Sequence, residues 1–458
     1  MGRSLLVEAS REVIGECEVA PALIPNLLDE RTISKLDCSH KVKVRPSAEE
    51  ESNVIPTSRD LLTPPSTLGS NRDVIRQHNL SAVLRLLRKY GTMSRSALAQ
   101  RTELNRSTIS DLVTELEELG LITESDTSDR IGVGRPSRMV ALSEDVVVFA
   151  VNPETDATTV GVVSLSGTVL RKERVTLSSV PEPGEAVKIT AQIIADIRRE
   201  LPRHARIAGI GVAIPGQVRV GDGVVRLAPH LNWVEVPFAS MLNQVTGLPV
   251  AIDNDASLGS IAELDFGAGR GFSEIVYMFG GAGGIGGGVV LGGNLLRGSA
   301  GYAGELGHVR ISDMPRDDYS GLQGTLEALV KREELLAALE LSSADDAELT
   351  ERLRAPVSSR VKKVLEFQLD ALAVAVGNFV NIFNPEIVLV SGYLAVLFGY
   401  DPDRLLKRFR WSTLNAPQDR LLVRPAELGP NLLMIGAAGL AFAELIEKPA
   451  STQLAPAH

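Results

Sequence analysis

Three consecutive polar residues, Asp253, Asn254 and Asp255, follow the apolar run Val250–Ile252 and precede a helical pattern. In open α/β sheets, side chains at such strand ends reach a ligand crevice. An amide beside carboxylates suits vicinal hydroxyl groups, because each hydroxyl both donates and accepts a hydrogen bond. In a phosphoryl transfer, Asp255 would also take the proton from the attacking hydroxyl. The simpler alternative is that Asp255 or Ser257 only caps the helix.

Further polar residues lie in glycine-rich segments after this motif. In Gly304-Glu305-Leu306-Gly307-His308, the glycines permit close backbone approach, and Glu305 and His308 share one side if the turn is helical. Glu327 could accept another hydroxyl. Taken alone, His308 is more often structural, and Glu327 is an ordinary first-turn glutamate favoured by the helix dipole. The sequence therefore predicts one hydroxyl-binding crevice, also lined by the loops that contain Gly216 and Trp233, with Trp233 as a wall or as core.

The elements that would position these residues begin at Val146. Short apolar runs alternate with helical patterns, which indicates α/β layers. The expected strands are 146–151, 160–163, 207–214, 250–252, 275–279, 289–291 and 387–390. The expected helices are 186–200, 238–246, 257–264, 326–339, 365–383 and 432–446. About 300 residues exceed one compact core, so we expect a first lobe at 143–254, a second at 255–446 and a polar tail at 447–458.

Residues 71–142 form a different pattern, typical of three helices and a two-stranded wing. The apolar positions of the first helix end at Gly91. Ser94 and Asn105 are placed to cap the second and third helices, and the third helix ends at Gly120. Strands at 121–123 and 139–142 flank a polar turn. This order is typical of a winged helix-turn-helix, whose second motif helix enters the DNA major groove. A three-helix bundle that binds protein is the alternative.

The start of that helix and the wing supply the predicted DNA contacts. Their side chains are short donors and acceptors with a few arginines, which suit phosphates and base edges. Arg135 on the wing would enter a narrow minor groove. The predicted DNA-binding residues are Ser94, Arg95, Asn105, Arg106, Ser107, Thr108, Ser110 and Arg135.

The composition restricts the class of protein. The 458 residues carry a net charge of −10, so attraction to DNA must come from a local basic surface. Cys17 and Cys38 are the only cysteines, which excludes a disulfide framework in the body. We expect a cytoplasmic protein without a membrane partner, because no apolar run is long enough to span a bilayer. Residues 1–70 are predicted to be a disordered extension, and an early start codon would explain them equally well.

Together these motifs resemble the ROK family (repressors, open reading frames, kinases), in particular its transcriptional regulators. The resemblance covers residues 75–445 and is strongest at Ala213–Gln217, Pro229–Trp233, Asp253–Ala256, Gly284–Gly288, Gly301–His308 and Asn381–Pro385. It implies an α/β fold with a winged helix-turn-helix followed by an actin-like (ribonuclease-H-like) two-lobed sugar-kinase body. It also implies homodimers or homotetramers on palindromic operator DNA. By the same resemblance, Asn254, Asp255, Glu305, His308 and Glu327 contact a sugar.

Two departures from the family pattern bear on chemistry. Kinase members carry an Asp-x-Gly-Gly-Thr phosphate loop where this chain has Asn152-Pro153-Glu154-Thr155-Asp156. Proline removes a backbone donor and the two carboxylates repel phosphate, so we expect neither ATP as a cofactor nor enzyme activity. Many members also carry a cysteine-rich zinc motif, and here all three thiolates are missing between Asp318 and Glu327. Because His308 and Asp318 alone make a poor zinc site, we expect no metal.

Three hypotheses follow. The leading one is a regulator, usually a repressor, of carbohydrate genes, controlled by a sugar or sugar derivative that closes the cleft. The second is an ATP-dependent hexose kinase with a regulatory DNA-binding head, which the intact Asp255 favours and the altered loop opposes. The third is a constitutive DNA-binding protein with a vestigial cleft, which the five retained polar residues oppose.

Overall fold

The computed structural model describes residues 72–125, 138–281 and 283–458. The predicted extension at 1–70 and Arg135 of the wing lie outside the described residues. The first described unit contains the helices α2 (Arg72–Tyr90), α3 (Arg95–Thr102) and α4 (Arg106–Glu118). The strands β1 (Met93–Ser94), β2 (Ile122–Ser125) and β3 (Met139–Leu142) form an antiparallel sheet in the order β1-β3-β2. The predicted winged helix-turn-helix is therefore confirmed.

Local capping explains where the two motif helices begin. The Ser94 side chain accepts a hydrogen bond from the Ala97 amide and caps α3. Asn105 Oδ1 accepts from the Thr108 amide at 2.8 Å and caps α4. Such caps satisfy backbone donors that a helix start leaves free. Leu98 of α3 and the leucine, isoleucine and valine side chains of α4 are buried in one core with α2.

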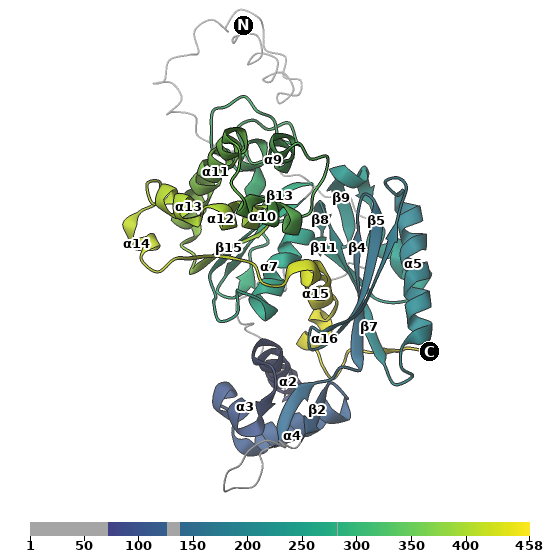
Figure 1. Ribbon diagram of the computed structural model, residues 1–458. Helices are drawn as coiled ribbons and strands as arrows, with labels where there is room; N and C mark the ends of the chain where they lie inside the picture. The colour runs from purple at the N-terminus through teal and green to yellow at the C-terminus, as the bar shows by residue number, and fades with distance from the viewer. Residues whose placement is uncertain (1–71, 126–137, 282) are drawn as a thin grey trace, which may run out of the picture. The chain divides into compact units, whose positions relative to one another are not determined.

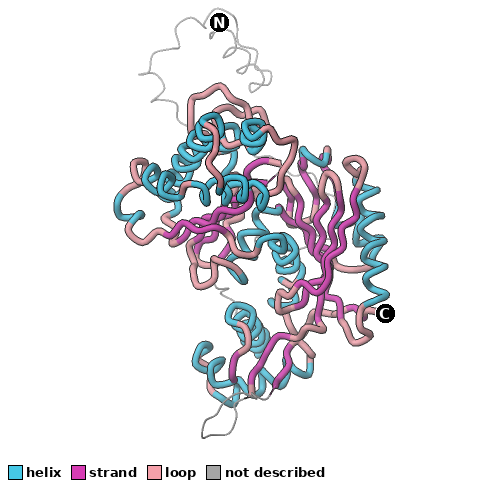
Figure 2. The backbone as a smooth tube through the Cα atoms, viewed as in Figure 1, coloured by secondary structure: helices cyan, strands magenta, loops and turns pink. Residues whose placement is uncertain are grey.

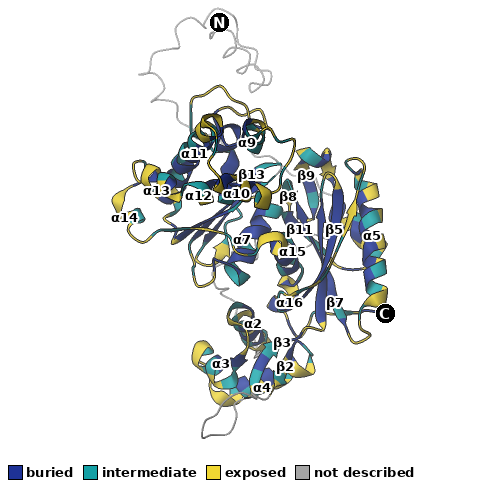
Figure 3. Cartoon of the chain, in the orientation of Figure 1, coloured by how far each residue is buried: buried dark blue, intermediate teal, exposed yellow. Residues whose placement is uncertain are grey.

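The first lobe is built on a mixed sheet in the order β11-β7-β4-β5-β6. Its strands are β4 (Val146–Pro153), β5 (Ala157–Ser164), β6 (Val169–Thr176), β7 (Arg206–Ile214) and β11 (Val250–Asn254). Every residue of β4 and β5 is buried, which agrees with their apolar sequences (Figure 3). The helices α5 (Pro183–Glu200) and α6 (Phe238–Thr246) contribute apolar side chains to its core. The strands β8 (Gln217–Arg219), β9 (Val224–Ala228) and β10 (Trp233–Val236) form a small additional sheet.

The second lobe contains a sheet in the order β14-β13-β12-β15-β16. Its strands are β12 (Ile275–Gly281), β13 (Gly284–Leu291), β14 (Asn294–Leu295), β15 (Ile387–Gly392) and β16 (Leu422–Pro425). Its helices are α8 (Leu326–Leu329), α9 (Arg332–Leu339), α10 (Asp346–Arg354), α11 (Ser359–Phe383), α12 (Tyr393–Tyr400), α13 (Pro402–Phe409) and α14 (Asn415–Gln418). Among the described residues α11 alone is long and apolar enough to span a bilayer, and it is mostly buried in this lobe's core.

Two helices connect the lobes. The helix α7 (Asp255–Phe266) follows β11 directly and packs on β12 and β13. The helix α15 (Leu432–Ala441) packs on α7 and on β4 and β7 of the first sheet. The alternation of strands with covering helices is visible in Figures 1 and 2. The strand of Asp253 and the helix of Asp255 thus meet where the lobes join.

The structure differs from the sequence prediction in several elements, including the expected helix 432–446, which is α15 followed by the separate helix α16 (Ala443–Glu447). The expected helix 326–339 is two helices, α8 and α9, separated at Val330 and Lys331. The strand β6 was missed, since its four consecutive charged residues, 171–174, interrupt the apolar pattern on a half-exposed edge. The expected polar tail is partly ordered, because β17 (Ala455–Pro456) pairs antiparallel with β7, and Arg198 donates to the Pro456 and Ala457 carbonyls.

Candidate functional site

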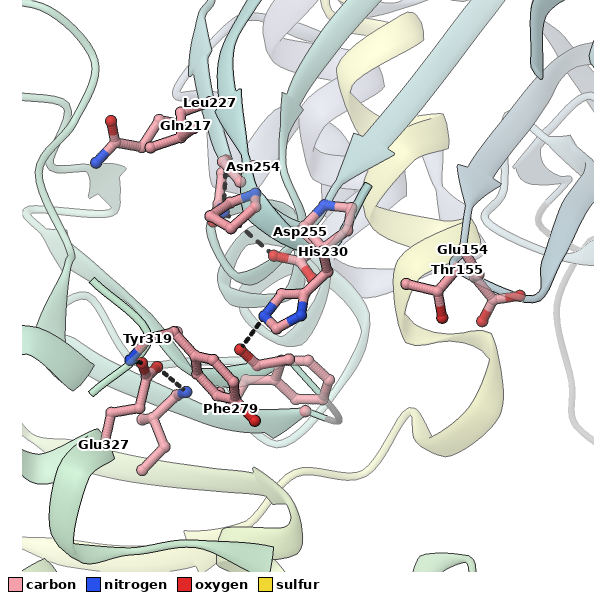
Figure 4. A pocket seen from close by; sticks show the side chains of 18 of the residues that line it. Glu154, Thr155, Gln217, Leu227, His230, Asn254, Asp255, Phe279, Tyr319 and Glu327 are labelled. Carbon is pink, nitrogen blue, oxygen red and sulfur yellow. Dashed lines mark hydrogen bonds between the residues drawn. The ribbon is translucent and has the colours of Figure 1, made fainter. Parts of the chain in front are cut away.

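A cavity of about 380 Å³ lies where the two sheets meet. All six predicted ligand-binding residues line it: Gly216, Asn254, Asp255, Glu305, His308 and Glu327. They come from four segments that are distant in sequence, which the fold brings to one place. Figure 4 shows Glu327 on one side of the pocket and Glu154 with Thr155 on the other.

Asn254 and Asp255 stand at the junction of β11 and α7. Asn254 Oδ1 accepts from the Ser257 amide at 3.0 Å and caps α7, while its Nδ2 donates to the Gly216 carbonyl at 3.0 Å. Asp255 Oδ1 accepts from the Ala256 amide at 2.8 Å. The cap of α7 is therefore Asn254, and not Asp255 or Ser257 as the simpler alternative had it, and the Asp255 carboxylate lines the cavity beside it.

The carboxyl group of Asp255 has an unusual environment. Burial raises its pKa from 3.8 to about 7, and the nearby charge of Glu305 acts in the same direction. Backbone donors at Ala256 and Asp255 oppose that rise only in part. The preceding Asp253 faces away from solvent and forms an ion pair with Arg297. Asp255 is thus a carboxyl group that changes charge near neutral pH.

His308 is oriented by a buried carboxylate. Its Nδ1 lies 2.9 Å from Asp318 Oδ2, which also accepts from Thr325 Oγ1 at 2.9 Å. Burial alone lowers the pKa of His308, but the hydrogen bond with Asp318 and the neighbouring acidic charges raise it above its usual value. Since the carboxylate binds Nδ1, Nε2 is the ring nitrogen that remains for a ligand.

Glu327 is fixed in the same way by backbone groups. Its Oε2 accepts from the Ile285 amide at 2.7 Å, and its Oε1 from the Tyr319 amide at 3.4 Å. Gly284, with φ +127°, lies so close that a Cβ there would overlap Glu327 Oε2. The glycine at this turn therefore serves the close approach of a carboxylate to the β12–β13 hairpin.

His308, Asp318 and Glu327 place their ligand-type atoms within 4.8 Å of one another. The zinc that the family resemblance implies does not fit these residues. Both oxygens of Asp318 are already bonded, Oδ1 to the Ser320 and Leu322 amides and Oδ2 to His308 and Thr325. Glu327 is committed to two amides, and no thiolate is present among these groups. The cluster is a hydrogen-bonded network in which Asp318 takes a central position.

The β4–β5 turn closes the other side of the cavity. The Glu154 amide donates to the Ala157 carbonyl at 2.8 Å, and Pro153 has no amide hydrogen. The Glu154 and Asp156 carboxylates both contact Arg174 of β6, at 3.4 and 3.1 Å. Arg174 thus offsets part of the negative charge that the sequence alone suggested for this turn.

The lining residues that were not singled out as ligand-binding include the aromatic side chains of His230, Phe279 and Tyr319. His230 Nε2 lies 2.6 Å from the Gly283 carbonyl, and its ring packs edge-on against Tyr319 with centroids 4.9 Å apart. His230 belongs to the Pro229–Trp233 loop, which the sequence did place at the crevice. Trp233 itself is a core residue, 1% exposed, with its indole bonded to the Pro181 carbonyl.

The predicted DNA-contact residues divide into two groups. Arg106 and Ser107 are exposed at the start of α4. Arg95, by contrast, forms a bidentate pair with Glu124 of the wing and donates to Ser110 Oγ. Ser94 and Asn105 act as caps. DNA contact by these residues stays a prediction, and Arg95 and Ser110 have a role inside the domain.

The helix-turn-helix contacts both lobes through arginines that bind helix ends. Arg206, at the start of β7 in the first lobe, donates to the Leu119 and Gly120 carbonyls after α4, at 2.7 and 2.6 Å. Arg270, in the turn after α7, donates to the Lys89 carbonyl near the end of α2. Cations at helix C-termini satisfy free carbonyls and the helix dipole. The helix α4 is thus hydrogen-bonded to the first lobe, and α2 is hydrogen-bonded to the turn after α7.

Arg88 of α2 makes the most buried of these contacts. Its Nε lies 3.4 Å from Asp265 Oδ2, and its guanidinium stacks 4.9 Å from the Phe266 ring at the end of α7. A Cβ at Gly439 of α15 would lie 3.0 Å from its Nη2. Burial lowers the pKa of Arg88, and its Nε and Nη1 have no hydrogen-bond partner among the described residues. Arg88 therefore lies between the two helices that join the lobes.

The comparisons with known proteins agree with this architecture. Residues 149–444 match the ROK family, and residues 76–123 match a winged helix-turn-helix DNA-binding family. The xylose repressor of Caldicellulosiruptor bescii is 27% identical over 396 residues, 83% of this chain and 99% of that protein. The glucokinase of Thermotoga maritima is 34% identical over 268 residues, 52% of this chain and 81% of the kinase.

A solved structure has a similar fold. The crystal structure of a ROK family transcriptional regulator, a homologue of the Escherichia coli Mlc protein, superposes with a TM-score of 0.68 at 23% identity. It covers 82% of this chain and 98% of its own. The chain belongs to the ROK family, with a winged helix-turn-helix in front of the actin-like sugar-kinase fold.

Proposed function

We propose that this protein is a cytoplasmic transcriptional regulator of carbohydrate genes, acting as a repressor whose DNA affinity changes when a sugar binds in the cleft. The relatives named as sugar repressors support the class of protein, since one of them matches the chain over both the DNA-binding and the ROK regions. The cavity with its five polar side chains supports the class of effector.

One observation carries the proposed coupling of the two sites: α7 begins at the cavity and ends at the DNA-binding domain. Asp255 is its first residue, and Asp265 and Phe266 at its other end contact Arg88 of α2. From Asp255 to Asp265 the helix rises by ten residues, so α7 is a rigid connection of about 15 Å. A sugar that favours one lobe arrangement would shift α7 against α2.

The two arginine caps convert such a shift into a change within the helix-turn-helix. Arg206 ties α4 to the first lobe, and Arg270 ties α2 to the turn after α7. Relative movement of the lobes therefore changes how α2 supports α4. A buried, incompletely bonded Arg88 raises the free energy of this arrangement and so reduces its advantage over a second one. Coupling of this kind requires only that the sugar prefers one arrangement.

The kinase alternative has one feature in its favour. A carboxyl group with a pKa of about 7, as in Asp255, suits a general base. The β4–β5 turn opposes it, because that turn offers Pro153 and an already bonded Glu154 amide to a phosphate. Release of ADP in the presence of ATP, magnesium and a sugar bound by the protein would establish the alternative.

The mode of DNA binding follows from the class of domain. One helix-turn-helix reads one half-site, and two copies on a palindromic operator read half-sites one helical turn apart. We therefore propose a homodimer or homotetramer on DNA. Fluorescence anisotropy with DNA from upstream of its own gene tests this function, because a sugar that binds the protein must change the measured Kd for DNA.

A further inference from the structure

The chemical lining of the cavity indicates which sugars it accepts. Five carboxyl groups face it, from Glu154, Asp156, Asp255, Glu305 and Glu327. Within the described part of the chain, no lysine or arginine lines the cavity, and His230 and His308 are its only basic side chains. Resting on the proposed sugar-binding function, we propose that the effector is a neutral, unphosphorylated sugar and that the cleft rejects sugar phosphates.

Backbone amides are the other groups that bind phosphate in proteins, above all at helix starts and glycine-rich turns. At the start of α7, the Ala256 amide donates to Asp255 at 2.8 Å and the Ser257 amide to Asn254 at 3.0 Å. Side chains of the protein therefore occupy donors that an anion would need.

The glycine-rich hairpin between β12 and β13 is closed in the same manner. The Ile285 amide donates to Glu327 Oε2 at 2.7 Å, so a carboxylate already stands at the turn. A phosphate here would meet this charge at close range, where two like charges in a partly buried site repel strongly. The glycines of this segment thus permit the approach of Glu327, and the carboxylate excludes an anion.

The β4–β5 turn completes the barrier on the opposite side. The Glu154 amide is bonded to the Ala157 carbonyl, and Glu154 and Asp156 present carboxylates to the cavity. Arg174 contacts both carboxylates from β6 and offsets only one of the two charges. Neutral hydroxyl groups, by contrast, can donate to every one of these carboxylates.

This selectivity can be tested by calorimetric titration of the full chain. The ligands are D-glucose, D-xylose, N-acetyl-D-glucosamine and their terminal phosphate esters. We expect a neutral sugar to bind and its phosphate to bind at least about 100-fold more weakly. The neutral methyl ether at the phosphate-bearing oxygen separates charge from size, and should bind within about fivefold of the parent sugar. Weak binding of both the ether and the phosphate would contradict selection by charge.

The double variant Glu154→Gln with Asp156→Asn tests the role of the turn. It removes two negative charges and releases Arg174. The ratio between the Kd for the phosphate ester and the Kd for the parent sugar, which is the penalty on the phosphate, should therefore shrink at least about tenfold. Glu173→Gln on β6, whose partner is Arg171, is the matched control and should leave the penalty unchanged.

A phosphate ester that binds as tightly as its parent, or more tightly, would overturn this inference and leave sugar control of DNA binding intact. Absence of binding by every sugar and every phosphate would instead overturn the proposed function, and the inference with it.

Discussion

The Nδ1 atom of His308 lies 2.9 Å from Oδ2 of Asp318, and Asp318 is bonded through both oxygens to its own loop. The sequence left open how the loop that holds His308 is kept rigid once the family's thiolates are missing. A buried carboxylate supplies the answer, since it fixes the histidine ring and three neighbouring donors at once. Orientation of a binding histidine by a carboxylate is a common device in protein sites.

The variant Asp318→Asn should weaken sugar binding by about tenfold or more, because a charge-assisted hydrogen bond contributes about 1.5–3 kcal/mol. Calorimetry with the effector sugar measures the change. Asp313→Asn, an exposed residue of the same segment, is the control and should bind like the wild type. Equal affinities in Asp318→Asn and wild type would show that His308 does not need its partner.

Treatment with a strong chelator should leave the thermal midpoint of unfolding and the sugar affinity unchanged, because hydrogen bonds take the role of a metal around Asp318. Differential scanning calorimetry before and after EDTA checks this expectation. Stoichiometric zinc in the purified protein, lost together with several degrees of stability, would refute it.

Sugar affinity should depend on pH through Asp255. Burial raises the pKa of its carboxyl group to about 7, and only the ionised form accepts two sugar hydroxyl hydrogens. The protonated share grows as pH falls below 7, so affinity should decrease from pH 8 to pH 5.5, approaching about tenfold per unit. Asp255→Asn should bind sugar weakly and should lose the decrease of sugar affinity between pH 8 and pH 5.5. If the variant kept that decrease, the pH dependence would belong to another group, such as His308.

Arg88→Met should uncouple the two sites. The sugar affinity of this variant should stay within about twofold of wild type. Coupling of this kind typically changes the affinity for DNA by about 5–150-fold, and in Arg88→Met the change caused by sugar should fall below about threefold. Asp265→Asn should act in the same direction. Arg85 lies on the same helix as Arg88, and Arg85→Met removes only its exposed ion pair with Glu447. This variant should keep full coupling. Full coupling in Arg88→Met would exclude this contact as the route.

Arg106 and Arg95 should give different results on substitution by alanine. Arg106 is exposed at the start of α4, so Arg106→Ala should weaken DNA binding by about 1–3 kcal/mol and reduce the salt dependence if it contacts phosphate. Arg95→Ala leaves the buried Glu124 side chain with only its longer pair to Arg138, at 3.6 Å, and should first lower the stability of the domain. Salt-dependent anisotropy and thermal unfolding of both variants distinguish these roles.

Much of this architecture could be predicted from local patterns. The caps at Ser94 and Asn105 and the polar residues at the end of β11 can be recognised from a few neighbouring positions of the chain. The lobe-bridging contacts could not, because they depend on packing. His230 meets a carbonyl 53 residues away, and Arg270 meets one 181 residues away. Arg88 looks like an ordinary basic residue of an amphipathic helix, and only the fold shows that it is buried.

We propose that sugar in the cleft alters DNA binding through α7. The most direct test of this coupling is one anisotropy titration of operator DNA, repeated at increasing concentrations of a neutral sugar that calorimetry shows to bind. We expect at least about a fivefold change in the Kd for DNA in the wild type. The same titration should show little change in Arg88→Met. A Kd for DNA that stays constant while the cleft becomes saturated with sugar would contradict this coupling.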